Sequence, residues 1–253
     1  MPATSESASG APQRVWLVLP TYNEADNLER LVTAVRERLP ESGRILIVDD
    51  NSPDGTGRIA DRLAGEHADV GVLHRARKEG LGPAYIAGFR EALAQGAELV
   101  IEMDADFSHD PAYLPQLLRA AEKADLVIGS RYVPGGGVTE WGAVRRWISR
   151  GGSSYARRTL GVGVRDLTGG FKCIRREVLE AIDLDTIDSK GYAFQVEVTY
   201  RALMAGFRVV EVPIVFRDRR EGNSKMSRAI VAEAIWRVPA MRLRRRTPSS
   251  DEG

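Results

Sequence analysis

Short apolar runs alternate with helix-like segments along the first half of the chain, and this alternation constrains the fold more than any other feature. Strands are predicted over the apolar runs at 15–19, 44–49, 70–74, 98–103 and 125–129. Helices are predicted after the first strand, where Leu28, Leu31, Val32, Val35 and Leu39 recur at helical spacing, and over 56–64 and 83–94. Such alternation forms a largely parallel α/β sheet with right-handed crossovers and helices on both faces.

The second half has a looser pattern. Residues 141–160 and 194–205 predict helices, 171–175 could form a strand, and 208–216 is a β-rich run interrupted by Pro213. An apolar stripe predicts one more amphipathic helix within 227–246, formed by Ile230, Val231, Ala234, Ile235 and Val238. We expect one domain over 14–240, with a first half at 14–130 and a second at 131–240. A polar tail (1–13) precedes it and a basic, then polar, tail (241–253) follows.

Composition excludes several classes of protein. Cys173 is the only cysteine and the three histidines lie far apart, so we expect no disulfide within the chain, no Cys/His zinc site and a reducing compartment. No apolar stretch approaches the about 20 residues that span a bilayer, and the first residues lack the pattern of a signal peptide. The dinucleotide fingerprint GxGxxG and the phosphate loop GxxxxGK[ST] are both missing from the strand-to-helix junctions.

The apolar run at 99–103 ends abruptly in Asp104-Ala105-Asp106. Uncompensated buried charge is costly, and ligands of open α/β sheets collect at the carboxyl ends of strands. Asp104 and Asp106 therefore predict a site for Mg²⁺ or Mn²⁺, completed by the phosphates of a nucleotide. Two solvated turn aspartates are the alternative interpretation.

Three other predicted strands are followed by segments rich in polar, charged or glycine residues. Their ends carry PTYNE at 20–24, DDNS at 49–52 and RKEGLG at 77–82. Tyr22 could stack on a nucleobase while Asp50 accepts from its N–H groups, although DDNS alone could equally be a helix N-cap. Together with the aspartate pair, these ends predict one nucleotide-binding edge.

On these segments the chain resembles the family 2 glycosyltransferases of GT-A fold, a Rossmann-like architecture. The motifs are LPTYNE at 19–24, DDNSPDGT at 49–56, GLGPAY at 80–85 and DADFSHDP at 104–111. Within that family it looks most like the dolichol- and polyprenol-phosphate mannose synthases. The second half supports this with GSRY at 129–132, LTGGFKCIRREVL at 167–179, SKGYAFQVE at 189–197 and REGNSKM at 220–226.

The resemblance implies a role for each matching residue. Nucleotide-sugar binding falls to Pro20, Tyr22, Glu24, Asp50, Asp104, Ala105, Asp106, Arg131, Arg219 and Lys225. The metal would bind Asp104 and Asp106, with Ser108 a weaker candidate because some members carry an amide there. Arg131, Ser224 and Lys225 would hold the lipid phosphate, and the catalytic set would be Asp106, Arg131 and Lys225.

The implied reaction moves mannose from GDP-mannose to a polyprenyl monophosphate with inversion. The acceptor phosphate is already ionised near neutral pH, so no general base is needed. Two alternatives stay open: another family 2 transferase, such as a polyprenyl-phosphate glucosyltransferase or one using a UDP-sugar, and a non-catalytic nucleotide-sugar-binding module.

Basic and aromatic residues of the second half suggest contact with a membrane. Between 131 and 176 the chain has ten Lys and Arg against two acidic residues. The segment 141–160 combines Trp141, Trp147 and Tyr155 with five arginines, which suits a helix at a membrane interface. A surface helix packed on its own sheet is the alternative, as is a plain final helix for 227–246. We expect a peripheral protein on the cytoplasmic face, with a separate anchoring protein as a further partner and no nucleic acid.

Overall fold

The computed structural model describes residues 14–139, 143–187, 189, 191–217 and 236–242. Within 143–148 and at 192 only the backbone is described. Of the predicted site residues, Arg219, Ser224 and Lys225 lie outside this part of the chain, as does most of the segment 227–246. In the described residues no helix is both long and apolar enough to cross a membrane.

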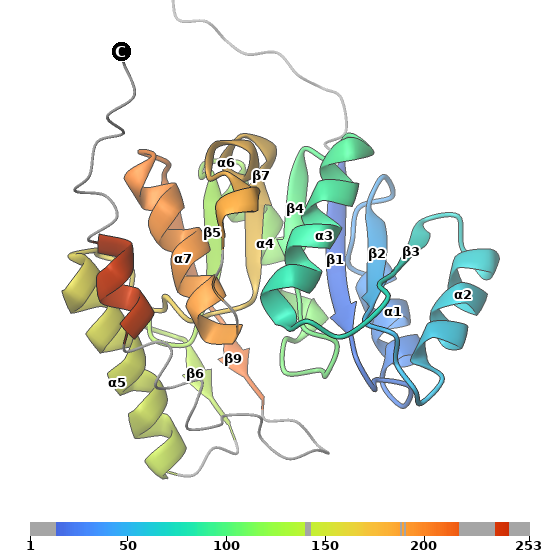
Figure 1. Cartoon of the computed structure of the whole chain (residues 1–253), viewed down its shortest axis with the longest axis horizontal. Coiled ribbons are helices and arrows are strands. Elements are labelled where there is room, and N and C mark those ends of the chain that lie inside the picture. The colour runs from blue at the N-terminus through green and yellow to red at the C-terminus, as the bar shows by residue number, and fades with distance from the viewer. Residues whose placement is uncertain (1–13, 140–142, 188, 190, 218–235, 243–253) are drawn as a thin grey trace, which may run out of the picture.

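A seven-stranded sheet forms the centre of the molecule (Figure 1). Its strands run in the order β3-β2-β1-β4-β7-β5-β8. They are β1 (Val15–Thr21), β2 (Arg44–Asp49), β3 (Val70–His74), β4 (Leu99–Glu102), β5 (Leu126–Ser130), β7 (Lys172–Arg175) and β8 (Val209–Pro213). All neighbouring pairs are parallel except those of β7, which runs antiparallel to both β4 and β5. The mostly parallel sheet predicted from the alternation is confirmed.

Helices cover both faces of this sheet (Figure 1). One core contains side chains of α1 (Leu28–Arg36), α2 (Thr56–Glu66) and α4 (Leu114–Ala121), packed on Val15, Leu17 and Leu19. The other contains side chains of α3 (Leu81–Ala94), α5 (Ala143–Leu160), α6 (Arg176–Ala181) and α7 (Gly191–Met204), packed on Trp16 and Val18. Successive β1 residues alternate between the two cores because side chains of a strand point to opposite faces.

Smaller elements complete the described chain. The 3-10 turn η1 (Pro111–Tyr113) precedes α4, and η2 (Leu184–Thr186) follows α6. Strands β6 (Gly137–Val138) and β9 (Val215–Phe216) form a separate parallel ribbon. Residues 236–242 are helical, and Val238 among them is buried in the core that α5 and α7 share.

Several elements differ in extent from the sequence-based predictions. The predicted helix 83–94 begins two residues earlier, and 194–205 becomes α7, which begins at Gly191. α5 runs unbroken through Gly151 and Gly152. α4 was not predicted. It has an apolar face (Leu114, Leu117, Ala121) but only about two turns, and Pro115 lies in its first turn, where proline is tolerated.

Candidate active site

The carboxyl ends of β1, β2 and β4 lie side by side at one edge of the sheet. Thr21 is in register with Asp49, and Val18 is in register with Glu102. The segments that follow these three strands carry Tyr22, Asp50 and the Asp104/Asp106 pair. The predicted nucleotide-binding residues of the first half are therefore brought to a common edge, as expected for parallel strands.

Asp49 organises the loops that leave β1 and β2. Its side chain is buried and accepts from the Thr21 and Ser52 hydroxyls at 3.3 and 2.6 Å. The Ser52 hydroxyl in turn accepts from the backbone N–H of Asn23 at 3.1 Å. Asn23 and Asn51 both have left-handed backbone conformations, with φ of 60° and 56°. Asn tolerates this conformation better than most residues, so the sharp turns of both loops follow from the sequence.

Asp50 is held in one orientation by Arg75, the residue after β3. Their side chains meet at 2.5 Å between the guanidinium and Oδ1, and Arg75 also pairs with Glu79 at 2.8 Å. Burial raises the pKa of Asp50, and the charge and hydrogen bond of Arg75 oppose that rise. Nearby, the Lys78 ammonium lies 3.6 Å from the centre of the half-buried Tyr22 ring. Lys78 adds positive charge at this edge and lies within the RKEGLG segment that the sequence pointed to, whereas Arg75, which orients Asp50, was not predicted.

The Asp104 to Asp106 turn is braced by two residues that the sequence interpretation missed. The buried Tyr85 hydroxyl donates to Asp104 Oδ1 at 3.0 Å, and the Asp104 backbone N–H donates to His109 Nδ1 at 3.1 Å. His109 therefore has its proton on Nε2, and burial lowers its pKa, while the charges of Asp104 and Asp106 oppose that lowering. Tyr85 precedes this turn in the sequence and His109 follows it. Together they fix its orientation.

Asp106 and Ser108 follow Asp104 in the same turn and carry further oxygen atoms. Asp106 Oδ1 accepts from the Ser108 backbone N–H at 3.0 Å. Ser108 is buried, and its hydroxyl has no hydrogen-bond partner in the described part of the chain. An unsatisfied buried hydroxyl beside two carboxylates fits an oxygen-ligated divalent cation. Among the described residues no three His, Cys, Asp or Glu side chains are grouped as a metal site.

A fully buried ion pair lies beneath this turn. Glu102 on β4 faces Lys172 on β7 in the antiparallel register, and Lys172 Nζ is 3.9 Å from Glu102 Oε2. Lys172 also donates to the backbone carbonyl of Gln195 at 3.1 Å and to its side-chain carbonyl. Burial raises the pKa of Glu102 to about 7, although the Lys172 charge lowers it. Through Lys172 and Gln195, the pair connects β4, which precedes the aspartate turn, to α7.

Arg131 follows β5 and is paired with a second buried carboxylate. Its Nε and Nη2 donate to the two oxygens of Asp166 at 2.8 and 2.7 Å, and Nη2 also donates to the Thr168 hydroxyl at 2.8 Å. Burial raises the pKa of Asp166, but the charge and hydrogen bonds of Arg131 outweigh it and the net shift is downward. The predicted phosphate-binding arginine is therefore held rigidly by a partner that the sequence interpretation did not single out.

Aromatic rings connect Arg131 with the aspartate turn. His109 stacks on Phe171 with ring centres 5.0 Å apart and meets the edge of Phe216 at 5.5 Å. The Arg131 guanidinium lies 5.5 Å from the centre of the same Phe216 ring. Phe216 belongs to β9, so the small ribbon closes one side of the site. The sequence predicted that the strand ends lie together, but it gave no indication that Phe216 contacts His109 and Arg131.

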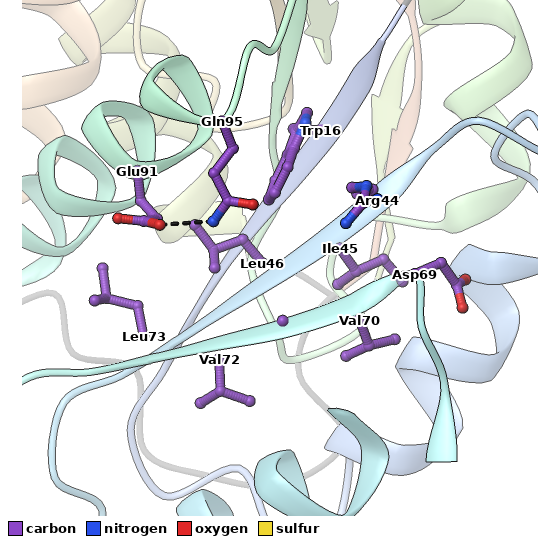
Figure 2. A pocket seen from close by; sticks show the side chains of 11 residues that line it. Trp16, Arg44, Ile45, Leu46, Asp69, Val70, Val72, Leu73, Glu91 and Gln95 are labelled. Atoms are coloured by element: carbon purple, nitrogen blue, oxygen red, sulfur yellow. Dashed lines mark hydrogen bonds between the residues drawn. The ribbon is translucent and has the colours of Figure 1, made fainter. Parts of the chain in front are cut away.

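One described pocket lies away from this edge. It has a volume of about 200 Å³ and is lined by the beginnings of β1 and β2, by most of β3 and by the end of α3 (Figure 2). Arg44 lies 5.7 Å from the centre of the Trp16 ring, and Gln95 donates to Glu91 at 2.6 Å. None of the predicted site residues lines it, and the site chemistry is at the opposite ends of the strands.

The chain belongs to glycosyl transferase family 2, whose family model matches residues 16–183. It is 52% identical over 225 residues to the undecaprenyl-phosphate mannosyltransferase of Micrococcus luteus, covering 89% of this chain and 92% of that protein. It is 50% identical over 236 residues to the polyprenol monophosphomannose synthase of Mycolicibacterium smegmatis, covering 92% and 89%.

Solved structures show the same fold at lower identity. Glucosyl-3-phosphoglycerate synthase from Mycobacterium tuberculosis, in complex with Mn²⁺, UDP-glucose and phosphoglyceric acid, has a TM-score of 0.66. The match covers 95% of this chain and 82% of that one, at 20% identity. The GT-A fold predicted from the motifs is therefore confirmed.

Proposed function

We propose that the protein transfers mannose from GDP-mannose to a polyprenyl monophosphate and produces polyprenyl β-mannosyl phosphate. The observation that carries this proposal is the identity of 50 and 52%, over about nine tenths of the chain, to two proteins named for polyprenyl-phosphate mannosyl transfer. The edge that joins Asp50, Asp104 and Asp106 supplies the groups that a nucleotide-sugar diphosphate requires.

The donor nucleoside binds at the ends of β1 and β2 in this proposal. Pro20, Tyr22, Glu24 and Asp50 surround it, and Asp50 accepts from base N–H groups. Because Arg75 holds Asp50 in place, little side-chain entropy remains to be lost on binding. Lys78 adds positive charge at the same edge, which favours a nucleotide over a neutral sugar.

The donor diphosphate lies against the Asp104 to Asp106 turn. Asp104 and Asp106 hold Mg²⁺ or Mn²⁺, with the Ser108 hydroxyl as a further oxygen and the Ala105 backbone between them. The metal, when bound, neutralises charge that develops on the departing diphosphate. Tyr85 and His109 keep the turn in the orientation that presents its carboxylates to one ligand.

The acceptor phosphate attacks the anomeric carbon of mannose directly. One of its ionised oxygens forms the new bond while the bond from that carbon to the GDP oxygen breaks, so no proton moves and no general base is needed. In-line attack inverts the α-linked donor to a β-linked product. Arg131, oriented by Asp166, positions the acceptor phosphate together with Ser224 and Lys225, and Arg219 faces the donor phosphates.

The acceptor places the enzyme at a membrane. We propose peripheral binding on the cytoplasmic face through α5 and the helical residues 236–242, with a separate anchoring protein as a further partner. α5 has buried Ala156 and Leu160 on its inner face and the exposed Tyr155 and Arg158 outside. Aromatic and basic residues of this kind meet the headgroup region of anionic bilayers.

Transfer of label from GDP-mannose into an organic-extractable product tests the proposal. Purified protein is mixed with polyprenyl phosphate and Mn²⁺ or Mg²⁺, with Asp106→Ala in parallel. We expect labelled lipid from wild type and a loss of at least about 100-fold in the variant, because electrostatic stabilisation of the leaving group is removed. Asp61→Ala removes an exposed carboxylate of α2 and serves as the matched control.

The same assay separates the alternatives. Product from UDP-glucose but not from GDP-mannose would replace the proposal with a polyprenyl-phosphate glucosyltransferase. Donor binding without any lipid product would indicate a non-catalytic nucleotide-sugar-binding module. Equal activity of Asp106→Ala and Asp61→Ala would remove the metal role from the mechanism.

A further inference from the structure

A second cavity, rich in arginine, lies beside α5 and is not lined by the aspartate turn. It has a volume of about 320 Å³ and is lined by Tyr132, Arg150, Ser154, Arg157 and Arg165. Arg150, Ser154 and Arg157 come from α5, at a spacing that places them on one helical face. Tyr132 follows β5, and Arg165 lies in the segment between α5 and β7. Three arginines and two hydroxyl groups therefore surround one cavity.

None of these three arginines has an ion-pair partner among the residues that the structure describes. Two carboxylates close to Arg165 are already engaged. Glu211 accepts from the backbone N–H groups of Arg165 and Asp166 at 2.8 and 2.9 Å, while Asp166 is paired with Arg131. Three like charges around one cavity repel one another, and an anion in that cavity would relieve the repulsion.

We infer that this arginine cavity binds a phosphate group, at a site distinct from the donor and acceptor sites proposed above. Guanidinium groups match the geometry of phosphate oxygens and form paired, charge-assisted hydrogen bonds with them. The Ser154 hydroxyl provides a neutral donor in the same cavity, whereas the Tyr132 hydroxyl is already hydrogen-bonded to Ser149 at 2.6 Å. The phosphate is that of a phospholipid headgroup or of a free phosphate or diphosphate, since the recognition chemistry is the same.

Tyr132, which lines the cavity, also lies next to Arg131. The Tyr132 ring centre is 5.9 Å from the Arg150 guanidinium and 5.2 Å from that of Arg131. Arg165 and Tyr132 directly adjoin Asp166 and Arg131 in the sequence, and those two residues form the buried pair. An anion bound in the cavity therefore sits one side chain away from the arginine proposed to hold the acceptor phosphate.

Equilibrium binding of two probes, without donor and with EDTA present, tests this inference independently of any transfer reaction. One probe is inorganic pyrophosphate, followed by calorimetry. The other is vesicles of phosphatidylcholine mixed with phosphatidylglycerol, followed by co-sedimentation and compared with phosphatidylcholine alone. The variants are Arg157→Gln and Arg165→Gln, which approach the cavity from different segments. Arg158→Gln is the matched control, because it removes the same charge from the next residue of α5 without lining the cavity.

We expect each cavity variant to lose about tenfold in affinity for at least one probe. Arg158→Gln should stay within about twofold of wild type with pyrophosphate and should lose less affinity than either cavity variant with the vesicles, which its exposed charge also contacts. Loss confined to the vesicles would assign the phosphate to a lipid headgroup, and loss with pyrophosphate would assign it to a soluble anion. Either result supports the cavity as a site. Equal losses in the cavity variants and in Arg158→Gln would reduce the effect to general surface charge and overturn the inference, as would no loss with either probe.

Discussion

Arg131 and Asp166 show how buried charge is compensated next to the site. The Arg131 side chain is 5% exposed and that of Asp166 is 0% exposed. Every contact between them is a charge-assisted hydrogen bond, and the Arg131 backbone N–H adds one more at 2.9 Å. Removing one member of such a pair leaves an uncompensated buried charge, whereas the same change at the surface exposes the partner to water.

Asp166→Asn is therefore expected to lower the free energy of unfolding by about 3 to 5 kcal/mol. Asp69→Asn is the matched control, because Asp69 pairs with Arg36 at 2.7 Å with both side chains about one third exposed. That variant should lose no more than about 1 kcal/mol. Urea unfolding of the three proteins measures the difference, and equal losses would show that the buried pair contributes no more than a surface pair.

The loss of folding stability at acidic pH provides a second test of the Arg131–Asp166 pair. The folded-state pKa of Asp166 is lowered, so its contribution is fully present above the ordinary carboxyl pKa and is lost as pH falls through the lower folded value. Asp166→Asn has no carboxyl to protonate at this position. Its stability should therefore fall less steeply than that of wild type on acidification in this range.

Sequence analysis identified the residues that carry charge at strand ends but not the residues that orient them. Asp104 and Asp106 stood out because two carboxylates ended an apolar run. Tyr85 and His109, which hold that turn, lie within the GLGPAY and DADFSHDP motifs, but the motifs did not assign a role to either side chain. Lys172 lies 70 positions from Glu102, and only the register of β4 with β7 brings them together. Such contacts depend on tertiary structure and leave no local signal.

α3 can pack closely on the sheet because Gly88 has no side chain. A methyl group at Gly88 would lie closer than van der Waals contact to Val18 Cγ1 and 3.0 Å from Val48 Cγ2. Both valines belong to central strands, β1 and β2, whose backbone cannot move without disturbing the sheet. α3 therefore lies close to the strands that carry Tyr22 and Asp50 at their ends.

Gly88→Ala should accordingly destabilise the protein by about 1 to 3 kcal/mol, through overpacking. Gly65→Ala, in α2, places its methyl group where no atom lies within 4 Å. There the better helix propensity of alanine should stabilise by up to about 1 kcal/mol. Thermal unfolding of both variants measures the two effects, and a gain in stability for Gly88→Ala would contradict the close approach of α3.

Elements were predictable to different degrees for physical reasons. The five strands of the first half were located because buried parallel strands are continuous apolar runs. α4 was missed because its two turns offer too few positions for a clear helical period. The strand at 171–175 was recognised only as a candidate, and its position in the sheet could not be derived, because strand order depends on contacts far along the chain.

At the scale of the whole molecule, the proposed donor site predicts a metal-dependent gain in thermal stability. GDP with Mn²⁺, at about 100 times its dissociation constant, should stabilise the folded state by about 2.7 kcal/mol and raise Tm by about 5 to 10 °C. Differential scanning fluorimetry with and without EDTA measures this. Asp106→Ala should lose most of the shift while Asp61→Ala keeps it, and a shift that EDTA leaves unchanged would argue against metal-assisted binding.

The position of β7 between β4 and β5 has a consequence for how the chain folds during synthesis. β5 pairs only with β7 and β8 in the sheet, and both of these strands are encoded after it. When a ribosome has released residue 130, β4 has one open edge and β5 has no strand to pair with. The fold can close only after Lys172–Arg175 emerge and insert between strands that are already made, so the first half of the chain should need its second half, or a chaperone, to shield that edge.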